Sequence, residues 1–225
     1  MLACKRYLDW FNDPTKYFDA DKIQRIEDFL QHISHFEGEF NGVTFANSLL
    51  DWQLWCLCNI FGWYRADDHS KRVIRNVFLL ISRKNGKTGL SAAIMLADMI
   101  IGREAGYEGY LVANNREQAK VAFKFIKGFC CSIDPKHRHL KVYRDYITYD
   151  KTNSRIKVLS SDAMGNDGYN PSSFIWDETA AAKDFSNFNI LKSGQAMRKN
   201  PLSISISSAG FLLDGYPCYE QCKIG

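Results

Sequence analysis

Two short polar segments of this 225-residue sequence contain residue types that could bind and hydrolyse a nucleoside triphosphate. The first segment reads Ile81-Ser82-Arg83-Lys84-Asn85-Gly86-Lys87-Thr88, and it matches the phosphate-loop pattern at its Gly-Lys-Thr end, although Ile81 replaces the usual first glycine. In that pattern, backbone N–H groups and the N-terminus of the following helix cradle the phosphates. Lys87 would reach the β and γ phosphates, Thr88 would offer its hydroxyl to Mg²⁺, and Gly86 would let the backbone approach closely.

The residues around this loop decide between the motif and an ordinary polar helix start with a solvated lysine. A compact apolar run of strand length, residues 77–81, precedes the loop, and a long helical pattern begins at Lys87. A phosphate loop requires this order of strand, loop and helix. The context therefore favours the phosphate-binding interpretation.

The second segment is an apolar strand, residues 174–176, that ends in Asp177 and Glu178. Successive side chains of a strand point to opposite sides, so the two carboxylates can divide the work. Asp177 would join the Mg²⁺ shell, and Glu178 would orient and deprotonate the attacking water. Alone, such a pair more often caps the next helix, but the upstream phosphate loop makes hydrolysis the better hypothesis.

The remaining pattern predicts an α/β fold of the P-loop NTPase type, with a mainly parallel central sheet flanked by helices. Apolar residues recur at helical spacing from Asp21, and Asn47 or Ser48 could cap a second helix that runs through Trp63. Further strands are predicted at residues 110–113 and 202–207, with a helix over 116–131 between them. Residues 142–159 are more polar and predict a hairpin or an edge element.

Composition sets the class of protein. Hydrophobic residues make up 46% of the chain, which is enough for a large core, and the net charge of +4 permits a nucleic-acid partner without requiring one. Seven cysteines without a CxxC pair indicate reduced thiols rather than a disulfide framework or a structural metal. No signal peptide or membrane span is recognisable, so an intracellular, soluble protein is expected.

With these residues in view, the sequence resembles the terminase large subunits of tailed phages over nearly its whole length, in their N-terminal ATPase domain. The resemblance rests on the phosphate loop and on four other motifs: Asp51-Trp52-Gln53, Asn114-Asn115-Arg116-Glu117-Gln118-Ala119, Gly168-Tyr169-Asn170-Pro171 before the acidic pair, and Ser207-Ser208-Ala209-Gly210. It implies ATP and Mg²⁺ as cofactors. It also implies a motor that drives double-stranded DNA into the procapsid at its portal, in the host cytoplasm.

The resemblance gives several residues a role. Trp52 and Gln53 would form the adenine-side element, and Arg83 would help neutralise charge on the γ phosphate. Arg116 would be an arginine finger aimed at a neighbouring subunit's nucleotide. The coupling motif Ser207, Ser208, Ala209 and Gly210 would sense the γ phosphate. For Trp52, Arg83 and the coupling motif, a core aromatic, a surface arginine and a strand-end turn are the alternatives.

The same resemblance implies a division of the chain and a set of partners. A helical lead-in, residues 1–70, would carry the adenine-side element, and residues 71–225 would form the ATPase core. The nuclease domain that usually follows is not expected in this chain. Expected partners are the portal protein, the terminase small subunit and copies of the chain in a ring. A helicase-type ATPase core and a non-catalytic nucleotide-binding assembly module are the alternative functions.

Two basic clusters could contact DNA phosphates. Lys120, Lys124 and Lys127 fall on one face of the helix predicted over residues 116–131. The second cluster is Lys136-His137-Arg138-His139 with Lys141 and Arg144. A solvated surface is the commoner reason for either cluster.

Overall fold

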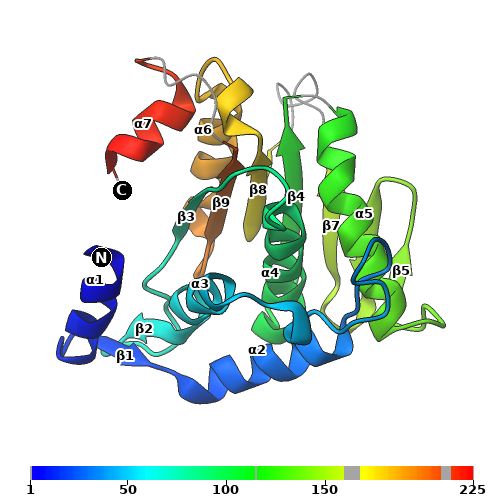
Figure 1. Ribbon diagram of the computed structural model, residues 1–225, viewed down its shortest axis with the longest axis horizontal. Coiled ribbons are helices and arrows are strands. Elements are labelled where there is room, and N and C mark those ends of the chain that lie inside the picture. The colour runs from blue at the N-terminus through cyan, green and yellow to red at the C-terminus, as the bar shows by residue number, and fades with distance from the viewer. Residues whose placement is uncertain (1, 115, 160–167, 209–213, 225) are drawn as a thin grey trace.

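A computed structural model describes residues 2–114, 116–159, 168–208 and 214–224 of the chain (Figure 1). The helices are α1 Leu2–Phe11, α2 Ala20–His32, α3 Asp51–Gly62, α4 Lys87–Gly102, α5 Arg116–Ile133, α6 Ser186–Gly194 and α7 Pro217–Ile224. The strands are β1 Lys16–Phe18, β2 Trp63–Arg65, β3 Asn76–Leu80, β4 Glu108–Ala113, β5 Leu140–Val142, β6 Tyr146–Tyr149, β7 Ser154–Val158, β8 Ser173–Asp177 and β9 Leu202–Ser207.

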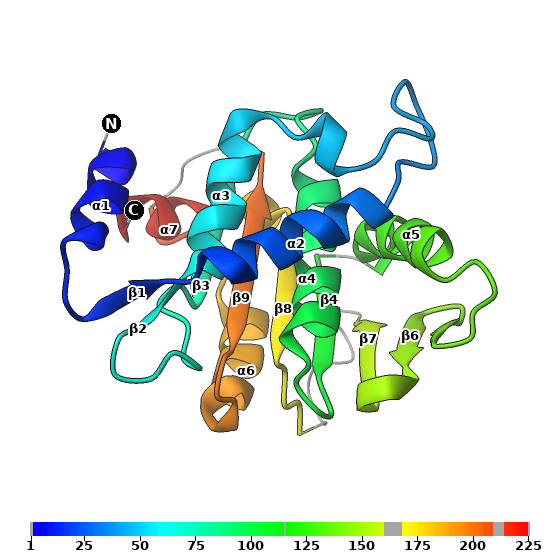
Figure 2. The same ribbon diagram turned by 90° about the horizontal axis from the view of Figure 1, so that it is seen from below.

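The central sheet has seven strands in the order β3-β9-β8-β4-β7-β6-β5, which Figure 2 shows from β3 to β6. The five strands from β3 to β7 are parallel, and β6 and β5 continue the sheet antiparallel. The α/β class with a mainly parallel sheet is thereby confirmed. Because parallel strands have their carboxyl ends at one edge, the loops after β3, β4, β8 and β9 meet there.

Side chains of the sheet alternate between two cores. Ile175 of β8 packs into the larger core with α2, α3, α4 and α5, whereas Phe174 and Trp176 pack on the other face against Leu191 of α6. Helix α4 lies against the sheet with residues 89–99 all buried, so the helix that follows the phosphate loop is held firmly. Because α4 is buried in the core, it holds the end of the phosphate loop in place.

The sequence located most elements of the core, but it placed the start of one helix wrongly. Helix α3 begins at Asp51, not after a cap at Asn47 or Ser48. Ser48 ends a short 3-10 turn, and its hydroxyl donates to the carbonyl of Phe45. Gln53 caps α3 instead, because its side-chain oxygen accepts from the Leu50 N–H at 2.9 Å.

The predicted hairpin and the predicted lead-in differ in how closely the structure matches them. The predicted hairpin is present as β6 and β7, and β7 joins the sheet by pairing parallel with β4. The lead-in is less purely helical than expected, since β1 and β2 form a small antiparallel sheet within it. Its helices α2 and α3 share one continuous core with α4, and the division at residue 70 stays a prediction.

Within the described residues, no helix is long and apolar enough to cross a membrane.

Candidate nucleotide site

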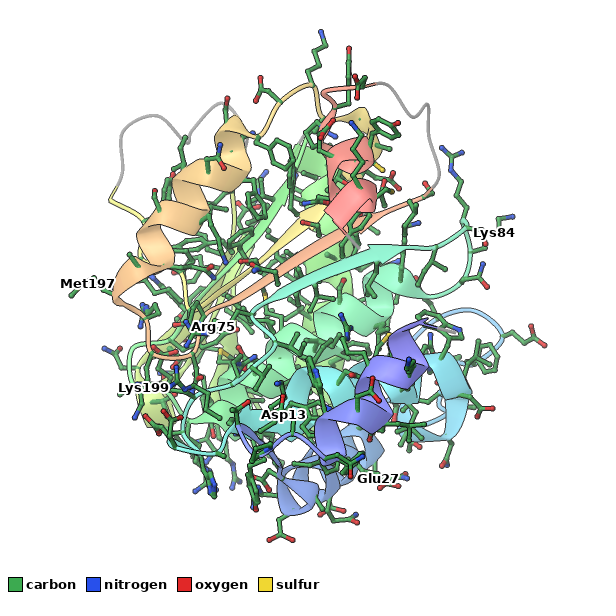
Figure 3. All side chains as sticks on the ribbon, turned by 90° about the vertical axis from the view of Figure 1, so that its left-hand side faces the viewer. Asp13, Glu27, Arg75, Lys84, Met197 and Lys199 are labelled. Carbon is green, nitrogen blue, oxygen red and sulfur yellow. The ribbon has the colours of Figure 1, made fainter. Side chains whose placement is uncertain are left out.

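The phosphate loop lies between the end of β3 and the start of α4, as the pattern predicts. Its backbone enters the left-handed region at Lys84 (φ 65°) and at Gly86 (φ 72°), which is the N-cap of α4. The Asn85 side-chain amide donates to Ser82 Oγ at 2.6 Å and braces the turn. Figure 3 shows Lys84 projecting outward from this loop. At the N-terminus of a helix, backbone N–H groups point outward and can bind an anion such as phosphate.

Ile81, the departure from the usual pattern, has a structural explanation. Its N–H donates to the Ser207 carbonyl at 3.1 Å, and its half-buried side chain packs against the core. The first loop position therefore extends the pairing of β3 with β9. A side chain there is accommodated because the sharp turn comes later, at Lys84 and Gly86.

Asp177 and Glu178 differ in exposure and in backbone conformation. Asp177 ends β8 with 6% exposure, whereas the Glu178 side chain is 29% exposed. Burial and, to a smaller extent, the neighbouring Glu178 carboxylate raise the pKa of the Asp177 carboxyl to about 6, although the Glu178 N–H and the Lys87 charge act to lower it. Glu178 itself has φ 56° and ψ 51°, a left-handed conformation that costs free energy for a residue with a side chain.

The functional groups converge around Glu178. The ammonium of Lys87, a nearly buried residue, lies 3.9 Å from Glu178 Oε1. The hydroxyl of Ser208 is 3.3 Å from Oε2, and the hydroxyl of Ser207 accepts from the Ala180 N–H at 3.0 Å. The segments that follow β3, β8 and β9 therefore meet around the Glu178 side chain. Thr88 is half-buried in the first turn of α4 beside Lys87.

Asn114 is a further site residue, whose role the sequence did not reveal. It follows β4, and its side-chain amide donates to the Glu178 carbonyl at 2.9 Å. The bond holds the backbone of Glu178 in its left-handed conformation. The signal that could have found Asn114 is its place directly after a strand parallel to β8, since such positions meet at one edge of the sheet.

We expect Asn114→Ala to lower kcat for ATP by roughly tenfold and to leave KM nearly unchanged, because one backbone hydrogen bond contributes about 1 to 1.5 kcal/mol. Steady-state kinetics would measure both constants. In a Glu178→Gln background the substitution should have little further effect, because Asn114 acts through Glu178. An equal loss in both backgrounds would show that Asn114 acts elsewhere.

An open cavity of about 350 Å³ adjoins the loop, and Gln53, Lys84, Asn85, Gly86 and Phe125 are among its lining residues. This volume lies in the range of small-ligand sites. A Cβ atom on Gly86 would approach Gln53 Nε2 to 3.2 Å, so the amide sits directly against the loop. Gln53 thus lines the cavity beside the phosphate loop, and its adenine-side role stays a prediction.

Not all of the other predicted site residues line this cavity. Trp52 is half-buried and packs against the core, and it does not line the cavity. Arg83 is exposed on the phosphate loop. Arg116 begins α5, but its side chain lies outside the described part of the chain, as do Ala209 and Gly210 entirely. Their roles stay predictions.

Comparison with known proteins gives the family. The model of the terminase large subunit ATPase domain matches residues 51–224. The chain belongs to this family. The terminase large subunit of Lactococcus phage p2 is 26% identical over 207 residues, which cover 86% of this chain and 38% of that protein. The terminase large subunit of Enterobacteria phage HK97 is 32% identical over 139 residues, or 58% of this chain and 27% of that protein.

Solved structures agree with the fold of this terminase ATPase domain. The HK97 large terminase superposes with a TM-score of 0.67 at 22% identity, over 83% of this chain and 37% of that one. The ATPase domain of the Thermus phage P74-26 large terminase superposes with a TM-score of 0.50 at 17% identity, covering 61% of each chain. The chain spans well under half of the length of the curated relatives named above.

The predicted basic surface of the terminase domain is partly neutralised. On α5, Lys120 pairs with Glu117 at 2.6 Å, Lys124 pairs with Glu37, and Lys127 donates to the Arg144 carbonyl. In the second cluster, Lys141 pairs with Asp150 at 2.7 Å. These four lysines therefore have internal partners that DNA phosphates would have to replace.

Proposed function

We propose that this terminase domain hydrolyses ATP with Mg²⁺ and is the motor that moves double-stranded DNA into the procapsid. The observation that carries the proposal is the meeting of Lys87, Asp177, Glu178 and Ser208 at the carboxyl ends of β3, β8 and β9. A phosphate-binding cation, a metal-binding carboxylate and a candidate base are thus within one small site.

The residues fit both cofactors. Asp177 and Thr88 offer carboxylate and hydroxyl oxygens, the ligand types that Mg²⁺ prefers. Gly86 has a φ of 72°, which residues with a side chain rarely adopt, and a Cβ there would come within 3.2 Å of Gln53 Nε2, so glycine suits a backbone that closely approaches phosphates. A bound Mg²⁺ would neutralise charge that develops on the transferred phosphoryl group.

Each protein group then has a defined task. Lys87 would leave its contact with Glu178 and bind the β and γ phosphates, which frees the carboxylate. Glu178 would accept a proton from the attacking water, in a position set by Asn114. Ser208 would follow the movement of Glu178 and transmit it through β9, together with Ser207, Ala209 and Gly210.

Other parts of the proposal concern assembly. Arg83 would add positive charge at the γ phosphate, and Arg116 would supply an arginine finger to the neighbouring subunit in a ring. The basic surface of α5 would contact DNA backbone phosphates. The portal protein and the terminase small subunit would be partners at the procapsid in the host cytoplasm.

The test of the proposed activity is Lys87→Ala. We expect it to weaken ATP binding by about 10- to 100-fold, since a charge-assisted hydrogen bond contributes about 1.5 to 3 kcal/mol, and to reduce turnover with it. Calorimetry and phosphate release would measure the two effects. Lys151→Ala, an exposed lysine outside the site, is the control. Unchanged hydrolysis in Lys87→Ala would refute the proposed site.

A further inference from the structure

A short turn joins β5 and β6 at the end of the central sheet opposite to β3 (Figure 1). This β5–β6 turn comprises residues 143–146, with Arg144 and Asp145 at its tip, and the Tyr143 N–H donates to the Tyr146 carbonyl at 2.9 Å. The Asp145 carbonyl accepts from the N–H of Val158, the last residue of β7, at 2.9 Å. Because β7 runs parallel to β4 and β8, the β5–β6 turn lies at the edge of the sheet that also carries the candidate nucleotide site.

The main chain of this turn is held in place, whereas its charged side chain extends into solvent. The Lys127 ammonium of α5 donates to the Arg144 carbonyl at 3.0 Å. The rings of Tyr143 and Tyr146 stack with centroids 4.4 Å apart and planes inclined by 14°. The Arg144 side chain is 90% exposed, and its ion pair with Asp145 on the same turn is 3.9 Å long. Such a long, exposed ion pair contributes little free energy, so the guanidinium can exchange it for another anion at little cost.

The other basic side chains around β5 differ in whether a carboxylate compensates their charge. Lys141, within β5, pairs with Asp150 at 2.7 Å. Lys136 and Arg138, which precede β5, are exposed and form no ion pair within the part of the chain that the structure describes. The cations available to an external anion are therefore Lys136 and Arg138 at one end of β5 and Arg144 at the other.

We propose that the β5–β6 turn contacts the phosphate backbone of double-stranded DNA through Arg144. A guanidinium can donate two parallel hydrogen bonds to a phosphate, and arginine and tyrosine side chains are common donors to DNA phosphate oxygens. The hydroxyls of Tyr143 and Tyr146, which are 42% and 39% exposed, form no hydrogen bond within the described residues, so both can donate to neighbouring phosphates. Because the main chain of the turn is already held, DNA binding has to order only these side chains.

The two cations at the other end of β5 extend this contact along the duplex. Strand β5 has three residues and spans about 10 Å, at about 3.4 Å per residue. Phosphates of one DNA strand follow one another at about 3.4 Å along the helix axis, so a duplex that lies along β5 would bring further phosphates near Lys136 and Arg138. This inference rests on the proposed function and adds a DNA contact to the basic surface of α5, whose lysines have closer internal partners.

The experiment measures binding of a short fluorescent DNA duplex by anisotropy at several salt concentrations. We expect Arg144→Ala to weaken binding about 10-fold and to lower the slope of log K against log salt concentration by about 1. Arg144→Lys keeps the charge and should keep the slope. The matched control is the double variant Lys141→Ala with Asp150→Ala, which removes an exposed ion pair from the same hairpin without changing the net charge. It should change the affinity by about twofold or less.

ATP hydrolysis without DNA, measured in the same variants, separates this inference from the proposed function. The β5–β6 turn lies outside the catalytic residues, so we expect each variant to keep the parent's basal rate. A parent that binds no duplex, or an Arg144→Ala variant with the parent's affinity and salt slope, would overturn the DNA contact even if hydrolysis persists. Weaker DNA binding by Arg144→Ala in a chain that does not hydrolyse ATP would support the contact and refute the ATPase proposal instead.

Discussion

Glu178→Gln is expected to reduce ATP turnover by about 10² to 10⁴-fold, the usual contribution of a general base. Nucleotide affinity should change little, since the amide has nearly the same size and can still contact Ser208. Lys87 would lose the attraction of the carboxylate that lies 3.9 Å from its ammonium, which frees it for phosphate. Single-turnover phosphate release and calorimetric binding would separate the two effects.

The matched control is Glu27→Gln, a carboxylate of α2 that Figure 3 labels on the surface. It should retain full activity. Hydrolysis by Glu178→Gln at the parent rate would exclude Glu178 as the base. A loss of ATP binding equal to the loss of turnover would instead indicate that Glu178 contributes to binding and not to the chemical step.

Asp177→Asn is expected to abolish Mg²⁺-dependent turnover and, without metal, to stabilise the fold at pH 7.5. Burial raises the pKa of Asp177 from its usual 3.8 to about 6. The folded protein therefore binds a proton more tightly than the unfolded chain, and stability is lost as pH rises through about 6. The ionised carboxylate costs about 2 to 3 kcal/mol above that pH, and a neutral amide avoids this cost.

Thermal unfolding at several pH values would measure the effect. We expect Tm of the variant to exceed that of the parent by roughly 5 °C at pH 7.5 in a chelator, and the difference to shrink as pH falls to about 4, where the parent carboxyl is protonated. A Tm difference that does not depend on pH would contradict the assigned cause. Added Mg²⁺ and ATP should stabilise the parent and not the variant.

The sequence predicted those parts of the site that local pattern determines. An apolar run, a polar loop with Gly86 and Lys87, and a helix occur in unbroken order, and so do β8 and its acidic pair. The order of strands could not be predicted, because parallel neighbours are joined by long crossovers and their pairing depends on tertiary packing. The insertion of β9 between β3 and β8 is such a case.

Contacts between residues far apart in the sequence could not be predicted from local patterns either. Asn114 meets Glu178 only because β4 and β8 are adjacent, and the left-handed backbone of Glu178 has no glycine to signal it. The start of α3 was misplaced because Ser48 resembles a helix cap, whereas its hydroxyl is engaged with Phe45 and His35.

The position of β3 at the end of the sheet has a consequence for synthesis of the chain. Among the described strands, β3 pairs with β9 alone, from Asn76 with Ser203 to Leu80 with Ser207. The ribosome therefore makes the phosphate loop well before the strand that supports it, and at about 5 to 20 residues per second the delay is roughly 6 to 25 s. During that interval β3 has both edges free and is open to incorrect pairing. A nascent chain released before residue 202 should not bind ATP, so nucleotide binding would mark the moment at which the domain is complete.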